Sequence, residues 1–198
     1  MNNSRVFSSL RLVRNDGETH SINLFKNKYS YDKEKNRSAV IDIARKEIGV
    51  RESGHNSGPR IREYLAYVGF KEAAPWCSAF CSWCFGQAGL VKPRTAWSPG
   101  LFPVSRLARD GLPGMLIGIY FPSLGRIGHC GIIERVQGSM IFSIEGNTNV
   151  TGSREGDAVM RKVRHKRTIA KYSDWCSISS RDLSNVEMTK NTNKTWAF

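Results

Sequence analysis

The hydrophobic pattern of the chain changes its period near Pro113, and this change constrains the fold more than any other feature. Before it, apolar residues recur at helical spacing. After it, they alternate with polar residues in the segments GMLIGIYF, GHCGIIERV, SMIFSIEG and DAVMRKVRH, a pattern typical of strands. Helices followed by such a run predict an α+β fold, with N-terminal helices packed on an antiparallel sheet of four or more strands.

Three helices are expected before this change. In SAVIDIARKEIGV, Ser38 is a candidate N-cap, apolar residues follow at helical spacing, and Gly49 suits the helix end. Pro59 suits the first position of a second helix, which would close at Gly69. The third is predicted within APWCSAFCSWCFGQAG (74–89).

The length of 198 residues suggests one domain. The patterned zone predicts a domain over residues 38–175, between a polar N-terminal extension (1–37) and a polar C-terminal tail (176–198). No apolar run is long enough to span a membrane, and the first residues have no continuous apolar segment typical of a secretory signal peptide. We therefore expect a protein made in the cytoplasm, without a transmembrane segment.

The third helix carries Cys77, Cys81 and Cys84 within eight positions. The five cysteines of the chain are an odd number, which does not indicate a disulfide framework. On a helix the three would lie in a stripe about 60° wide, where buried packing explains Cys81 and Cys84. Seven helical residues rise about 10 Å, too far for two thiolates each about 2.3 Å from one zinc ion. A metal or cluster site would require a loop here.

A loop of that kind has a known example. The spacing Cys-x3-Cys-x2-Cys, with Trp83 before the last cysteine, resembles the cluster loop of radical S-adenosylmethionine enzymes. The resemblance covers eight residues and implies a large α/β barrel, whereas the segments after Cys84 predict mostly antiparallel strands. An iron–sulfur protein of this type is therefore the least favoured alternative.

Cys77 differs from the other two because it stands at the predicted helix start. Unpaired N–H groups and the helix dipole there favour a thiolate nucleophile. Such a nucleophile needs a base, and the base needs an orienting group. His129 lies between two glycines at the start of a predicted strand. Glu145 and Asn147 end the next strand two positions apart, and either could accept a hydrogen bond from the imidazole.

These blocks together resemble the CHAP family of cysteine- and histidine-dependent amidohydrolases and peptidases. APWCSAFCSWCFGQAGL is followed by GHCGIIERV and IEGNTN, in the order of that family, over roughly residues 38–175. The resemblance implies a papain-like fold that cleaves amide bonds in peptidoglycan, with Cys77 as nucleophile, His129 as base and Glu145 and Asn147 as orienting residues. It implies no metal or other cofactor.

A groove for the sugar or peptide of the substrate is also expected. Trp76 precedes the nucleophile, and the block TAWSPGLF, which contains Trp97 and Ser98, lies between the helices and the sheet. These three residues are the candidates for substrate binding. The backbone N–H of Cys77 is a candidate donor to the oxyanion.

The chain is strongly basic, with 30 Lys and Arg against 17 Asp and Glu and a formal net charge of +13. Such a surface attracts polyanions. Peptidoglycan and its anionic wall polymers are the expected partner, reached by phage-type lysis or contact-dependent release. The alternative is a nucleic-acid-binding protein whose cysteines are structural, with RKVRHKR (161–167) as its basic run.

The hairpin between the second and third predicted strands decides whether His129 can meet Glu145. A two-residue turn at Gln137-Gly138 would place the two side chains on opposite faces of the sheet. A three-residue loop over 136–138, or a bulge, would place them on one face. We therefore predict that loop or a bulge, with His129, Glu145 and Asn147 on the face that meets Cys77.

Overall fold

The computed structural model describes residues 32–150 and 156–177 of the chain. Residues 1–31 of the predicted extension and 178–198 of the predicted tail lie outside the described residues. Within the described part, no helix is both long and apolar enough to cross a membrane.

Within the described residues, the first helix covers residues 32–46, so Ser38 lies inside it and the predicted N-cap there is wrong. The residues before Ser38 are rich in Lys, Glu and Arg, which favour a helix and extend it towards the N-terminus. Arg37 is buried, and its guanidinium lies 2.7 Å from the carboxylate of Asp174. Helix α2 (Pro59–Tyr67) begins at the predicted proline.

Helix α3 (Cys77–Gln87) is buried on every side. All nine residues from Cys77 to Phe85 are buried, so the helix has no solvent-facing stripe. A helix that is apolar all round belongs to a core, and α3 packs between α2 and the strands β3 and β4. The cysteine block is therefore a continuous helix rather than a loop.

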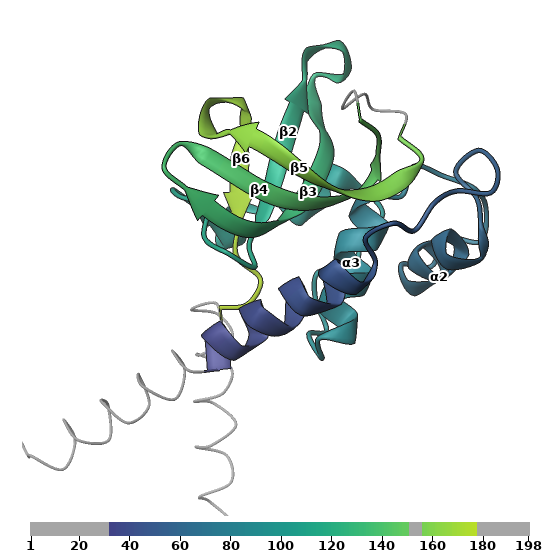
Figure 1. Cartoon of the computed structure of the whole chain (residues 1–198), viewed down its shortest axis with the longest axis horizontal. Coiled ribbons are helices and arrows are strands. Elements are labelled where there is room, and N and C mark those ends of the chain that lie inside the picture. Colours follow the sequence, from purple (N-terminus) through teal and green to yellow (C-terminus); the bar gives the residue numbers. More distant parts are fainter. Residues whose placement is uncertain (1–31, 151–155, 178–198) are drawn as a thin grey trace, which may run out of the picture. The chain divides into compact units, whose positions relative to one another are not determined.

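The sheet has six strands in the order β1-β6-β2-β3-β4-β5, and every adjacent pair is antiparallel. Figure 1 shows the sheet twisting across the side of α3. The predicted α+β class, with helices on an antiparallel sheet, is confirmed. The four predicted strands are present, and the short strands β1 and β6 were not predicted. The strands are β1 (Leu107–Ala108), β2 (Leu116–Phe121), β3 (Arg126–Gln137), β4 (Met140–Thr148), β5 (Ala158–His165) and β6 (Lys171–Ser173).

Two apolar clusters cover the two faces of this sheet. Ile132 and Ile144 pack with the helices in the larger cluster, whereas Ile133 and Ile141 belong to a smaller cluster on the other face. Neighbouring strand residues point to opposite faces of a sheet, and for this reason Ile132 and Ile133 belong to different clusters.

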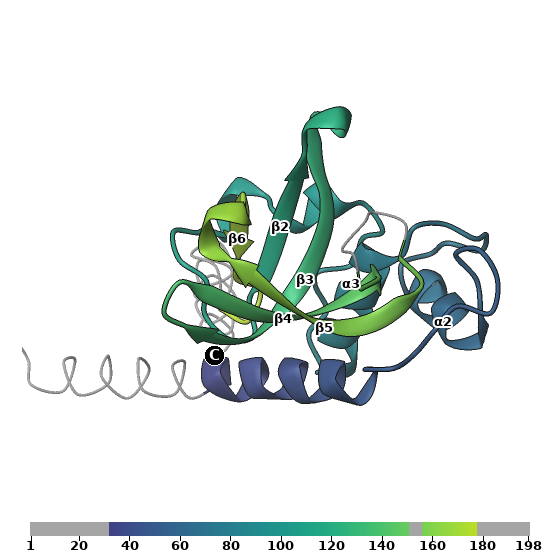
Figure 2. The ribbon, with the colours of Figure 1, turned by 45° about the horizontal axis from the view of Figure 1, so that its top comes forward.

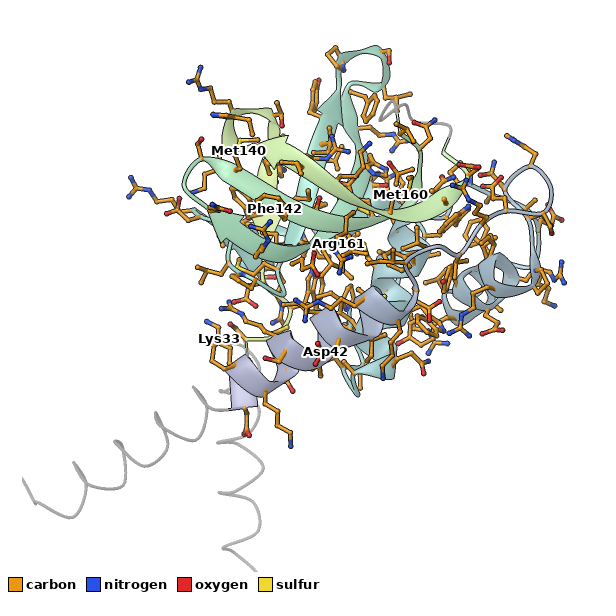
Figure 3. The ribbon with its side chains drawn as sticks, in the orientation of Figure 1. Lys33, Asp42, Met140, Phe142, Met160 and Arg161 are labelled. Carbon is orange, nitrogen blue, oxygen red and sulfur yellow. The ribbon has the colours of Figure 1, made fainter. Side chains whose placement is uncertain are left out.

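The first helix is tied to the sheet by a small ion cluster. The carboxylate of Glu134 on β3 accepts hydrogen bonds from Arg45 of the helix, at 2.7 Å, and from Arg161 of β5, at 2.8 and 3.0 Å. Figure 2 shows the helix running along the β4–β5 side, and Figure 3 labels Asp42 on the helix and Arg161 on β5. The hydrogen bonds from Arg161 and Arg45 outweigh burial and lower the pKa of Glu134 to about 2.

Candidate active site

Cys77 is the first residue of α3 and lies at the wall of a cavity of about 270 Å³. Its side chain is nearly buried, and its Sγ lies 3.5 Å from the hydroxyl of Ser98. Trp97, which lines the same cavity, is 60% exposed. A ligand in this cavity would therefore reach the thiol at the N-terminus of a buried helix.

A bulge in the β3–β4 hairpin brings His129 and Glu145 to one side of the sheet. The turn residues are Gly138 and Ser139, so the predicted three-residue loop over 136–138 is absent. The register shifts at Glu134, between the pairs Ile133–Ser143 and Arg135–Phe142. The prediction of a bulge that places His129 and Glu145 together is confirmed.

Glycine at position 131 makes room for the carboxylate of Glu145. A Cβ added to Gly131 would lie 2.5 Å from Cγ of Glu145. With that space free, Glu145 reaches along the strand, and its Oε2 lies 2.8 Å from Nε2 of His129. His129 is buried and Glu145 is fully buried, so the contact is shielded from water.

The carboxylate of Glu145 also accepts hydrogen bonds from two other residues of the sheet. Arg164 on β5 donates from Nε to one oxygen and from Nη2 to the other, both at 2.6 Å. The hydroxyl of Ser143 donates to Oε1 at 2.6 Å. The two oxygens are thus fixed by a bidentate arginine, the geometry that binds carboxylates most strongly.

The pKa values of the group follow from these contacts. Burial lowers the pKa of His129, but hydrogen bonds with Cys77 and Glu145 outweigh it and raise that pKa to about 9. For the carboxyl group of Glu145, burial raises the pKa instead. Hydrogen bonds with Arg164 and His129 outweigh burial and lower that pKa to about 2. The histidine is therefore a stronger base than a free imidazole, and its carboxylate partner stays ionised.

The pKa of Cys77 moves against the sequence-based expectation. A helix N-terminus was expected to favour the thiolate, but a hydrogen bond with Cys130 and burial raise the pKa of the Cys77 thiol. Hydrogen bonding to His129 acts in the opposite direction and lowers it. Since Nε2 of His129 is engaged by Glu145, the atom left for Cys77 is Nδ1. In the free site the thiol therefore keeps its proton, and the neutral form of His129, which predominates above the pKa of about 9, is the group placed to accept it.

Asn147 takes a different position from the one predicted. Its backbone φ is 53°, which turns its side chain out of the alternation of the strand. Its Oδ1 accepts the backbone N–H of Trp76 at 3.2 Å, and its Nδ2 donates to the carbonyl of Gly156 at 2.6 Å. Glu145 thus contacts His129, whereas Asn147 fixes the backbone immediately before Cys77.

The three predicted substrate-binding residues lie in different environments: one is in the core and two line the cavity. The ring of Trp76 is fully buried, packs 5.7 Å from the ring of Tyr64 and donates through Nε1 to Glu52 at 2.7 Å, so it belongs to the core. Trp97 is exposed at the cavity. Ser98 is buried and lines the cavity through its contact with Cys77.

Two residues near the site were missed in the sequence. Arg164 pairs with Ile141 and lies on the same side of β5 as Met160, the residue opposite Glu145. Its long side chain reaches the Glu145 carboxylate, a contact that the register alone does not predict. Cys130 is buried, with its Sγ 3.8 Å from Sγ of Cys81 and 3.6 Å from the hydroxyl of Ser78. Its position next to His129 in GHCG was the available signal.

Part of the basic run 161–167 forms ion pairs inside the fold. Arg161 binds Glu134 and Arg164 binds Glu145, so two of its arginines neutralise buried carboxylates. In the described ranges 32–150 and 156–177, no group of three His, Cys, Asp or Glu side chains is arranged to hold a metal ion.

Cys81 and Cys84 are fully buried among apolar side chains, as core packing predicts. We expect Cys84→Ala to lower the free energy of unfolding by about 1 kcal/mol, because the substitution removes one buried sulfur and leaves a small cavity. Urea unfolding followed by circular dichroism measures this. A loss above about 4 kcal/mol would show that Cys84 does more than fill space.

No protein-family model matches the chain, and no curated protein matches it in sequence. Among solved structures, the chain is similar to the crystal structure of Ly7917 and to that of Ly7917 with the hydrolyzing product of MDP. Both comparisons give a TM-score of 0.41 and 16% sequence identity, and they cover 71% and 70% of this chain. The chain covers 62% and 63% of those structures, less than two thirds of their length.

Proposed function

We propose that the protein is a cysteine-dependent hydrolase of amide bonds in bacterial peptidoglycan, with Cys77 as nucleophile and His129 as base. The observation that carries this proposal is the buried contact of His129 with Glu145, closed by Arg164, together with the effect that Cys77 and His129 have on each other's pKa. A nucleophile, a base in hydrogen-bond reach and a group that orients the base are the parts that acyl transfer requires. The sequence blocks and the basic surface support peptidoglycan as the substrate.

The proposed reaction begins when the amide carbonyl of the substrate enters the cavity beside Cys77. Sγ attacks the carbonyl carbon, and its proton passes to Nδ1 of His129. Glu145 stabilises the resulting imidazolium and keeps the ring oriented through Nε2. The backbone N–H of Cys77 donates to the oxyanion, since the first N–H groups of a helix have no partner within it.

In the second half, His129 returns the proton to the leaving amine, and a thioester joins the acyl group to Cys77. Water then attacks the thioester carbonyl while His129 accepts its proton. The carboxylic acid leaves and the thiol is restored. Trp97 at the open side of the cavity would pack against the sugar or peptide.

Loss of turbidity in a suspension of purified cell walls tests this function. We expect the protein to clear the suspension and to release either a free lactyl carboxyl group of muramic acid or new peptide amines. The first product defines an amidase and the second an endopeptidase. Walls left intact, together with tight binding to duplex DNA, would favour the nucleic-acid-binding alternative.

The net charge of +13 predicts that binding to walls weakens as salt rises. Exposed charges are screened over roughly 8–10 Å at physiological ionic strength and over less in stronger salt. Cosedimentation of the protein with walls across a salt series measures the effect. Binding that stays constant from low to high salt would show that the basic surface is not the wall contact.

A further inference from the structure

The cavity beside Cys77 is mostly apolar and contains one strong cation. Its charged lining residue, among the described residues, is Arg126, and two partly exposed aromatic side chains, Phe70 and Trp97, also line it. Ligand sites of this kind use a few polar groups to fix the orientation of a ligand that apolar walls hold. The composition of the walls thus favours a ligand with an anionic group close to the bond that Cys77 attacks.

Arg126 is held by the same strand as the proposed base. It is the first residue of β3, three positions before His129, and it pairs with Phe121 at the end of β2. Gly125, with a φ of 62°, makes the tight turn immediately before it. The position of the guanidinium relative to His129 is therefore set by a strand inside the sheet rather than by a long loop.

The guanidinium of Arg126 has donors left for a ligand. It makes one hydrogen bond, from Nη1 to the carbonyl of Ile127 at 3.1 Å, and within the described residues it forms no ion pair with a carboxylate. Arginines that stabilise the fold differ, since each binds a carboxylate: Arg37 with Asp174, Arg60 with Glu47, Arg161 with Glu134 and Arg164 with Glu145. The fork of donors on arginine fits a carboxylate bidentately.

A second cavity adjoins the first at Phe70. It has a volume of about 480 Å³ and is also lined by Arg62, Lys71 and Glu72. A substrate that fills both cavities would extend well beyond a single amide bond. This agrees with an oligomeric peptide or glycopeptide rather than a small free amide.

We propose that Arg126 binds a free carboxylate of the substrate next to the amide that Cys77 attacks, so that the protein selects carboxylate-bearing peptides over their amidated forms. The proposal rests on the hydrolase function proposed above and adds the feature of the substrate that the site recognises. Arg126 acts on specificity and takes no part in proton transfer.

The test compares soluble peptidoglycan fragments with the same fragments after their carboxylates have been converted to amides by carbodiimide and ammonia. We expect kcat/KM to be at least about tenfold higher on the free fragments, because a charge-assisted hydrogen bond is lost on amidation. Arg126→Gln is expected to lose this preference by slowing on the free fragments alone. Arg126→Lys is expected to keep part of it.

Arg109→Gln is the matched control, since Arg109 is exposed and does not line the cavity. It removes the same charge from the surface and is expected to keep the full preference, which separates the local contact from general attraction to a basic protein. Equal rates on both substrates in the parent protein, or an unchanged preference in Arg126→Gln, would overturn the proposal.

A binding experiment keeps the two proposals distinguishable if no fragment is cleaved. Calorimetry with Cys77→Ala protein measures affinity without turnover. Tighter binding of the free fragments than of the amidated ones, abolished by adding Arg126→Gln, would support the carboxylate site even where hydrolysis fails. Equal affinity for both would reject it.

Discussion

Purified Cys77→Ala protein is expected to leave a cell-wall suspension turbid, with a loss of activity of roughly 1,000-fold or more. The methyl group has no electron pair with which to attack the carbonyl, and no other thiol at the site begins a helix beside His129. The fold is expected to persist, because removal of one nearly buried sulfur costs on the order of 1 kcal/mol. The measurement pairs turbidity loss with thermal unfolding of the same preparation.

Cys84→Ala is the control for this experiment, because it makes the same chemical change in the same helix away from His129. It is expected to keep its activity while losing comparable stability. Full activity in Cys77→Ala would end the nucleophile hypothesis. Visible absorbance typical of an iron–sulfur cluster in anaerobic protein would revive the cluster alternative.

Glu145→Gln is expected to lower the pKa of His129 from about 9 and to reduce kcat roughly 100-fold or more. Glu145 stabilises the imidazolium through a contact of 2.8 Å, so the ring loses its proton at lower pH when the carboxylate is replaced by an amide. Arg164 would then stay close to the ring without its partner and lower that pKa further. The titration of the His129 ring by nuclear magnetic resonance measures the shift.

Glu134→Gln provides a matched control for Glu145→Gln. Glu134 is also a buried glutamate of the β3–β4 hairpin held by two arginines, but it lies in the helix–sheet junction and does not contact His129. Both substitutions are expected to reduce stability, because Glu134→Gln leaves Arg161 and Glu145→Gln leaves Arg164 without a carboxylate partner. Only Glu145→Gln is expected to move the titration of His129. An equal shift in both variants would mean that general destabilisation, not the loss of the contact, changes the ring.

The arrangement of secondary structure could be predicted because periodicity is a local property of the sequence. The change of period near Pro113 separated helices from strands, and Pro59 marked the start of α2. The start of the first helix was missed because a single candidate cap at Ser38 weighed more than the helix-forming residues before it. The strands β1 and β6 have two and three residues, too few for alternation to show.

The site was predictable where its residues follow from alternation and not where they depend on tertiary contacts. His129 and Glu145 were placed together by the register argument, although the bulge at Glu134 rather than a longer turn makes the shift. Asn147 could not be assigned, because a positive φ removes its side chain from the strand pattern. The partner of Glu145, Arg164, lies on a third strand whose register cannot be read from the hairpin alone.

The extra residue at Glu134 makes the site more sensitive to chain length than to side-chain type at that position. The register between β3 and β4 shifts by one residue at Glu134. Deleting a residue there would turn the side chains between Arg126 and Ile133 to the other face and carry His129 away from Glu145. Replacing the side chain would leave that spacing intact. An insertion in the outer turn at Gly138 and Ser139 would instead leave the pairing of His129 and Glu145 unchanged, because the turn lies beyond the bulge.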